Sequence, residues 1–183
     1  MINALIQLDR QLFISINHLP HNLILDSFFA FLTGIGYAGM IWFIIGIVIF
    51  IWEEIKDKRT LFALILSGIF SLLLGEFGIK NLIRRLRPQF TVPSTIIPFD
   101  VSHSFSFPSG HATIAFAAAF ILAKKHKKIA WVYYLLATLI SFSRIYLGKH
   151  YPSDILAGML LGLLIGYMSL AISTKLQSSA AKL

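Results

Sequence analysis

The sequence contains no cysteine, and charged side chains make up only 13% of its 183 residues. Without cysteine the chain has no disulfide, no thiolate nucleophile and no metal site built from thiolates. An ordinary soluble domain carries about 25% charged residues. The shortage of charge therefore argues against a cytosolic enzyme, a nucleic-acid-binding domain and a disordered chain.

Apolar residues are abundant instead: they make up 57% of the sequence, and the mean hydropathy is +0.78. A helix that crosses a bilayer needs about 20 mainly apolar residues. Long apolar runs recur along the chain and predict an all-α fold, a polytopic helical transmembrane bundle that forms one domain over residues 1–183. We expect five spans, at residues 35–52, 61–79, 108–123, 129–145 and 155–174.

Two further helical segments are expected before the first of these spans. In residues 1–21, Leu5, Leu8 and Leu12 recur at helical spacing among polar residues, which predicts an amphipathic helix in the membrane interface. The apolar run from Leu23 to Trp52 is too long for one straight span, and its glycines predict a break. We expect residues 23–33 to form a short or half-inserted helix, with a sixth span as the alternative.

Basic residues dominate the charge, with 16 Lys and Arg against 8 Asp and Glu and a net charge of +8. Lys and Arg concentrate in cytoplasmic loops. Under the five-span assignment, nine cations fall on one side of the membrane: Lys56, Lys58, Arg59, Lys124, Lys125, Lys127, Lys128, Lys175 and Lys182. That side, with the loop at residues 124–128 and the C-terminus, is predicted to be cytoplasmic. We expect the loop to contact anionic membrane lipids rather than nucleic acid.

A smaller basic group lies on the opposite side, where the positive-inside rule disfavours it: Lys80, Arg84, Arg85, Arg87, Arg144 and Lys149. Charge this close to the hydrocarbon is costly and usually functional. Lys80 and Arg87 are seven residues apart, so they share a helix face if the helix continues to Pro88. Cations along one helix face favour the binding of an anion such as a phosphate.

For three residues in this region, the sequence predicts a less specific role. Arg84 fits either a substrate contact or a headgroup anchor, whereas Arg85 is expected to face solvent or lipid headgroups. Glu76 precedes Lys80 by four residues, a spacing that predicts an ion pair along the helix.

Two more segments at this side carry chemistry. Pro108-Ser109-Gly110-His111 opens a predicted helix, whose free N–H groups attract anions. Asp154 lies in the first turn of the last helix, from which it reaches back to His150. A carboxylate that accepts a hydrogen bond from one imidazole nitrogen leaves the other nitrogen free to attack.

Together these segments resemble the three-part signature of the type 2 phosphatidic acid phosphatase superfamily of membrane lipid phosphatases. The matching motifs, within residues 80–154, are Lys80-x6-Arg87-Pro88, Pro108-Ser109-Gly110-His111 and Ser143-Arg144-x5-His150-x3-Asp154. The resemblance implies that His150 is the nucleophile and forms a phosphohistidine, that Asp154 orients it, and that His111 protonates the leaving group. It also implies a set of phosphoryl-binding residues: Lys80, Arg87, Ser109, Gly110 and Arg144.

The resemblance implies no metal or other cofactor, and the sequence has no carboxylate or histidine cluster at metal-ligand spacing. The expected enzyme lies in the bacterial cytoplasmic membrane, with its site on the outer face. Its expected substrate is undecaprenyl diphosphate. The alternatives are lipid A 1-phosphate, phosphatidylglycerophosphate or phosphatidic acid. A phosphate-binding transporter or channel remains the alternative from another class, and the sequence does not specify an oligomeric state.

Overall fold

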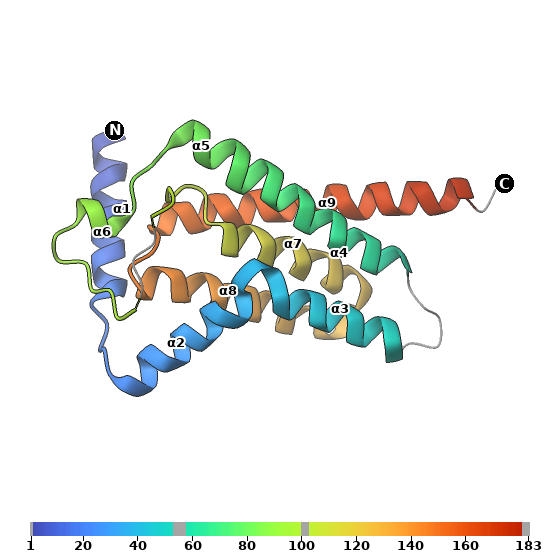
Figure 1. The fold of residues 1–183 in the computed structure, drawn as a ribbon, viewed down its shortest axis with the longest axis horizontal. Helices are drawn as coiled ribbons and strands as arrows, with labels where there is room; N and C mark the ends of the chain where they lie inside the picture. Colours follow the sequence, from blue (N-terminus) through green and yellow to red (C-terminus); the bar gives the residue numbers. More distant parts are fainter. Residues whose placement is uncertain (1, 53–57, 100–102, 181–183) are drawn as a thin grey trace.

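The computed structural model describes residues 2–52, 58–99 and 103–180, and these residues form helices and loops without a strand. Lys56 and Lys182, counted above among the cytoplasmic cations, lie outside the described residues. Figure 1 shows a long bundle of helices with one helix, α1, placed across its end. The all-α bundle predicted from the apolar runs is confirmed.

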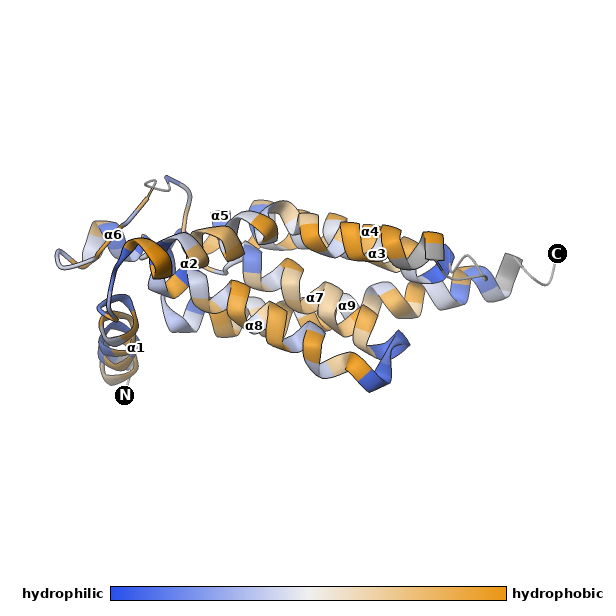
Figure 2. Ribbon diagram, turned by 90° about the horizontal axis from the view of Figure 1, so that it is seen from below, coloured by the Kyte–Doolittle hydropathy of each residue, from blue (hydrophilic) through white to orange (hydrophobic). Residues whose placement is uncertain are grey.

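Helix α1 (Ile2–Asn17) is the amphipathic helix expected at the N-terminus, and it runs at a steep angle to the bundle in both views (Figures 1 and 2). Phe13 and Asn17 are fully buried against the bundle, whereas Leu5 and Leu8 are more than half exposed. The Asn17 amide donates to the carbonyl of Tyr146 at 2.8 Å. These contacts fix the C-terminal end of α1 to the bundle and leave its apolar outer face free for the membrane interface.

The predicted break after the first apolar run is present. Helix α2 (Leu23–Gly36) and helix α3 (Met40–Trp52) are joined by the short turn η1 (Tyr37–Gly39). Ala38 has φ of 48° within this turn, so the two helices meet at a sharp kink. Leu23–Val48 is nevertheless one apolar stretch long enough to cross a membrane. The structure therefore joins residues 23–33 and 35–52, expected to be separate, into one kinked span.

Helix α4 (Lys58–Phe70) continues without interruption through the π-helical segment η2 (Ser71–Ile79) into α5 (Lys80–Ile83). The helix stops at Arg84, which is left-handed with φ of 52°. The condition stated above, that the helix continues to Pro88, is therefore not met, and Lys80 and Arg87 do not share a helix face. A residue that precedes proline is pushed out of the helical region, and Arg87 is accordingly extended with ψ of 156°.

After the short helix α6 (Pro88–Thr91) and a long loop, α7 (Gly110–Lys125) runs through the centre of the bundle. Most of its side chains are buried. Its main partner is α9 (Pro152–Ala180), whose Gly158, Gly162 and Gly166 face it. A Cβ at Gly158 would lie 2.6 Å from the carbonyl oxygen of Ser109. Small residues let the two backbones approach closely, as is common between membrane helices.

Four segments of the described chain are long and apolar enough to cross a membrane: Leu23–Val48, Lys58–Thr91, Lys127–Tyr146 and Pro152–Ser178. The third contains the short turn η3 (Lys127–Ile129) and helix α8 (Ala130–Tyr146). The remaining expected span is α7, which has only 16 residues and lies among the others. Figure 2 shows an apolar band along the bundle between hydrophilic ends. The chain is a multi-pass membrane protein.

The two ends of the bundle differ. Helices α1, α5 and α6 gather at one end, while the last turn of α3, the first turn of α4, the α7–α8 connection and the last described turns of α9 lie at the other (Figure 1). We call the first the α1 end. Seven of the predicted cytoplasmic cations lie toward the opposite end, in the first turn of α4, the last turn of α7, η3 and the last part of α9: Lys58, Arg59, Lys124, Lys125, Lys127, Lys128 and Lys175.

Candidate active site

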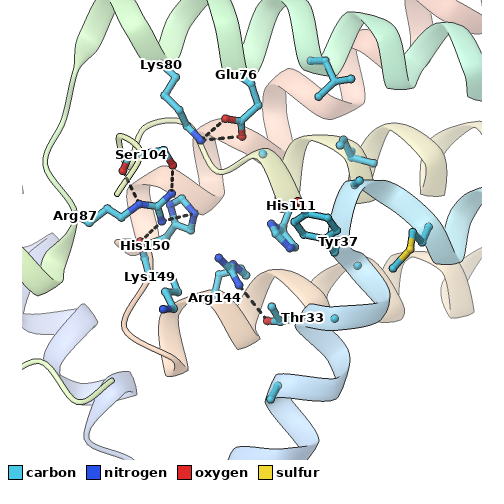
Figure 3. A pocket seen from close by; sticks show the side chains of 18 of the residues that line it. Thr33, Tyr37, Glu76, Lys80, Arg87, Ser104, His111, Arg144, Lys149 and His150 are labelled. Carbon is cyan, nitrogen blue, oxygen red and sulfur yellow. Dashed lines mark hydrogen bonds and ion pairs between the residues drawn. The ribbon is translucent and has the colours of Figure 1, made fainter. Parts of the chain in front are cut away.

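A cavity of about 880 Å³ opens near the α1 end of the bundle. Its charged and imidazole side chains come from distant parts of the chain: Glu76, Lys80, Arg87, His111, Arg144, Lys149 and His150. Figure 3 shows them arranged around one space, with His111 and Tyr37 on one side and His150 with Arg87 on another. Apolar side chains including Met40, Leu72 and Ile114 complete the lining.

A tight turn after α8 delivers His150 to this cavity. Gly148 has φ of +72°, and a Cβ there would lie 2.7 Å from the Ile96 carbonyl oxygen. The position therefore requires glycine. The amides of Lys149 and His150 both donate to the carbonyl of Arg144, at 2.9 and 3.2 Å. The turn places the His150 ring in the cavity wall, where the residue is only 2% exposed.

Asp154 stands behind His150 at the third position of α9. One of its oxygens, Oδ2, accepts the backbone N–H of Tyr151 at 2.8 Å, which is half of a capping box. The same oxygen lies 3.6 Å from His150 Nδ1. Ser106 lies between them: Nδ1–H donates to its hydroxyl at 3.4 Å, and the hydroxyl donates to Oδ2 at 2.5 Å. Ser106 was missed by the sequence analysis because it lies in an irregular loop without a motif.

This arrangement leaves the second ring nitrogen of His150 facing the cavity. With the proton on Nδ1, Nε2 carries the lone pair of the ring, which accepts from Arg87 Nη1 at 3.2 Å. Burial lowers the pKa of His150 to about 3, and the charges of Arg87 and Arg144 act in the same direction, against the opposing effect of Asp154. The imidazole is therefore neutral at pH 7 and able to act as a nucleophile.

Arg87 is held in place on three sides. Its Nε and Nη2 donate to the carbonyl and hydroxyl oxygens of Ser104 at 2.7 and 2.8 Å, and Nη1 donates to the Lys149 carbonyl at 2.8 Å. Ser104 was not expected from the sequence. The helix break before Pro88 therefore does not remove Arg87 from the site, because the extended chain carries it in from another direction.

Lys80 and Arg144 reach the cavity from opposite walls (Figure 3). Lys80 makes the predicted pair with Glu76, donating to both carboxylate oxygens at 2.7 Å. Arg144 donates to the Thr33 hydroxyl at 3.3 Å, and its buried Nε has no hydrogen-bond partner in the described chain. Lys80, Arg87 and Arg144 are only 4%, 3% and 7% exposed, so the cavity is strongly attractive to an anion.

The N-terminus of α7 contributes two of its predicted residues. Gly110 and His111 line the cavity, and the His111 ring is 6.3 Å from that of Tyr37. The Nε2 atom of His111 is buried without a hydrogen-bond partner among the described residues. Ser109 is also buried and does not line the cavity, but its backbone N–H donates to the Asp154 carbonyl at 3.1 Å.

The two adjacent arginines lie in different surroundings. Arg84 is exposed, donates to the Asn81 carbonyl at 2.9 Å and does not line the cavity. Arg85 was expected to face solvent or headgroups, which is wrong. It forms ion pairs of 2.7 Å with both Asp9 and Asp154. The contact could not be found from the sequence because its partners lie 76 and 69 residues away.

A buried imidazole backed by a carboxylate and facing several fixed cations is suited to phosphoryl transfer. The fold and the site together define an integral membrane phosphatase, a hydrolase. The chain belongs to the PAP2 superfamily, whose profile matches residues 58–178. The family resemblance drawn from the three motifs is confirmed.

Known proteins that resemble this chain are also named as phosphatases. The chain is 30% identical over 159 residues to the undecaprenyl-diphosphatase BcrC of Bacillus subtilis, which covers 86% of this chain and 79% of the relative. It is 33% identical over 120 residues to an undecaprenyl-diphosphatase of Sulfolobus acidocaldarius, covering 65% of this chain but only 58% of that relative's length. The crystal structure of a transmembrane PAP2-type phosphatidylglycerolphosphate phosphatase from Bacillus subtilis superposes with a TM-score of 0.74 at 29% identity, covering 94% of this chain and 88% of that one. Other relatives carry the names lipid A 1-phosphatase and phosphatidylglycerophosphatase B.

Proposed function

We propose that this membrane phosphatase hydrolyses undecaprenyl diphosphate to undecaprenyl phosphate through a phosphohistidine on His150. The observation that carries the mechanism is the position of His150 Nε2, which faces the cavity beside Arg87 while Asp154 stands behind Nδ1. Two of the relatives described above are named for this substrate. Lipid A 1-phosphate, phosphatidylglycerophosphate and phosphatidic acid are the alternative substrates, because the same chemistry serves each of them.

The proposed reaction assigns a step to each of these side chains. Lys80, Arg87 and Arg144, with the free N–H groups at the start of α7, bind the oxygens of the terminal phosphoryl group. His150 Nε2 attacks the terminal phosphorus, and the bond to the bridging oxygen breaks. His111 donates a proton to that oxygen, so the lipid leaves as its monophosphate. Water then attacks the phosphorus of the phosphohistidine and gives a proton to His111, and the P–N bond breaks, so inorganic phosphate leaves and both histidines return to their starting states.

We propose that this cycle needs no metal ion. The buried cations and helix N–H groups neutralise the charge that develops on the phosphoryl oxygens, which is the role a metal plays elsewhere. In residues 2–52, 58–99 and 103–180, no group of three or more His, Asp and Glu side chains is placed to hold a metal. Activity in the presence of a chelator is the direct measurement.

The proposed location is the bacterial cytoplasmic membrane, with the site facing outward. The basic loops at the end away from the cavity support this orientation. It puts α1 on the outer surface and the C-terminus in the cytoplasm. A reactive tag at His126 should then be inaccessible from outside the cell, and a tag within residues 92–99 accessible. The reverse pattern would overturn the orientation.

The test of function is phosphate release by purified protein in a chelating buffer, compared across the four lipid substrates named above. We expect release from undecaprenyl diphosphate to be fastest and to be blocked by vanadate. The His150→Ala variant should lose release, whereas His126→Ala, which changes a histidine at the opposite end of the bundle, should keep it. Full activity of His150→Ala would refute the mechanism. Phosphate uptake into vesicles without release from lipid would favour a transporter.

A further inference from the structure

Arg85 links the carboxylate behind His150 to the helix that lies across the end of the bundle. Its Nη1 donates to Asp154 Oδ1 at 2.7 Å, and its Nη2 donates to Asp9 Oδ2 of α1 at 2.7 Å. The guanidinium also lies over the ring of Tyr151, 4.0 Å from its centroid. One side chain therefore contacts α1, the first turn of α9 and the residue next to His150.

Asp9 reinforces the same junction directly. It accepts the backbone N–H of Ser153 at 2.9 Å and the Ser153 hydroxyl at 2.5 Å. That hydroxyl in turn accepts from Arg85 Nη1 at 2.6 Å. Ser153 is adjacent to Asp154, so the start of α9 is held from outside by a carboxylate of α1.

The Asp154 carboxylate has a contact on each oxygen, and the two differ in kind. Oδ2 accepts hydrogen bonds from the Tyr151 amide and the Ser106 hydroxyl, and it lies 3.6 Å from Nδ1 of His150. Oδ1 receives Arg85. Asp154 is fully buried, so these partners rather than solvent hold the rotation of its carboxylate, and Arg85 is the side chain that holds Oδ1.

We propose that Arg85 is a positioning residue that fixes the rotation of Asp154, and that Asp9 allows α1 to act on His150 through Arg85. The proposal rests on the proposed role of His150. The outward face of α1 carries exposed Leu5 and Leu8, so the seating of this helix in the membrane interface holds Asp9 in place. Arg85 does not line the cavity, so it acts on the rate of the chemistry and not on substrate binding.

The test is steady-state kinetics of the full-length protein in lipid nanodiscs, with undecaprenyl diphosphate as substrate. Arg85→Gln should lower kcat by about 10- to 100-fold, the usual cost of removing a group that orients a functional one. The KM should change by less than about threefold, because the phosphoryl-binding cations are untouched. Arg84→Gln is the matched control, an exposed neighbouring arginine whose loss should leave kcat unchanged. A kcat for Arg85→Gln within about twofold of wild type would overturn the proposal.

The link to α1 is tested by a double-mutant cycle. Asp9→Asn should lower kcat by a smaller factor than Arg85→Gln, and the double variant should lose no more than Arg85→Gln alone, since both changes break one connection. Asp26→Asn, a partly buried carboxylate paired with His21 at 2.7 Å, is the matched control. Losses that multiply would show that Asp9 does not act through Arg85.

Two safeguards keep the result interpretable. If Arg85→Gln does not yield folded protein, Arg85→Lys keeps the charge but reaches only one carboxylate, and kcat should fall with the melting temperature unchanged. An unchanged kcat would again refute the proposal. If His150→Ala is fully active, the proposed mechanism fails whatever Arg85 does; if it is inactive and Arg85→Gln is normal, only the role of Arg85 fails.

Discussion

The Glu76 carboxylate lies against the α-carbon of Gly110, where any side chain at position 110 would collide with its Oε1 atom. It thus sits beside the N-terminus of α7 while it holds Lys80 through both oxygens. Helix N-termini and lysines are both anion-binding groups. In this structure Glu76 therefore occupies part of the surroundings expected for a phosphoryl group.

The first prediction concerns this competition. In Glu76→Gln the cavity loses a negative charge, and vanadate should bind about tenfold more tightly. The melting temperature should fall, because the buried Lys80 loses its counter-charge. Vanadate inhibition and thermal unfolding of the purified variant measure the two effects. Weaker vanadate binding would mean that Glu76 helps the anion rather than competing with it.

The second prediction separates two arginines of the site. Arg144→Lys should lower kcat/KM about 10- to 100-fold, because lysine cannot make the two-pronged contact of a guanidinium with a phosphate. Its stability should hardly change, since within the described part of the chain Arg144 donates to one side chain only, Thr33, at 3.3 Å. Arg87→Lys should reduce both activity and melting temperature, because Ser104 and Lys149 lose their donors. Equal melting temperatures for the two variants would contradict this division.

The third prediction tests the turn that delivers His150. Gly148→Ala forces an L side chain into φ of +72° against the Ile96 carbonyl, so it should cost about 1–2 kcal/mol or more and displace His150. Thermal unfolding and kcat report the two consequences. Gly34→Ala is the control for stability: nothing lies within 4 Å of a Cβ there, and alanine favours the helix. A Gly148→Ala protein as stable and active as wild type would refute the role of the turn.

The fourth prediction concerns pH. The nucleophile must be neutral, and burial lowers the pKa of His150 from 6.5 to about 3. The acid limb of kcat/KM should therefore lie well below pH 6.5, with activity lost only as the pH falls toward the lowered value. A pH–rate profile measured with a buffer-independent phosphate assay shows this. A limb at or above pH 6.5 would mean that the imidazole is not shielded from solvent as the structure has it.

Much of the fold was predictable because a membrane constrains the sequence so strongly. Apolar runs located the spans, and the glycines before Met40 located the kink between α2 and α3. The π-helical segment from Ser71 to Ile79 was not predictable, because its apolar residues do not distinguish it from an α-helix. The end of the helix at Ile83 was also missed, since Pro88 alone does not reveal a left-handed residue at Arg84.

Contacts within one local motif could be predicted from the sequence alone. Pro152 and Asp154 set the start of α9, and the short spacing from His150 brings imidazole and carboxylate together through local helix geometry. The i,i+4 spacing determined the Glu76–Lys80 pair in the same way. Contacts between distant segments depend instead on how the whole fold packs. Arg85 joins Asp9 and Asp154. Ser104 accepts from Arg87, and Ser106 donates to Asp154. These residues meet because α1, α9 and an irregular loop pack together. No periodicity or motif encodes such contacts, since they depend on how whole helices lie against one another.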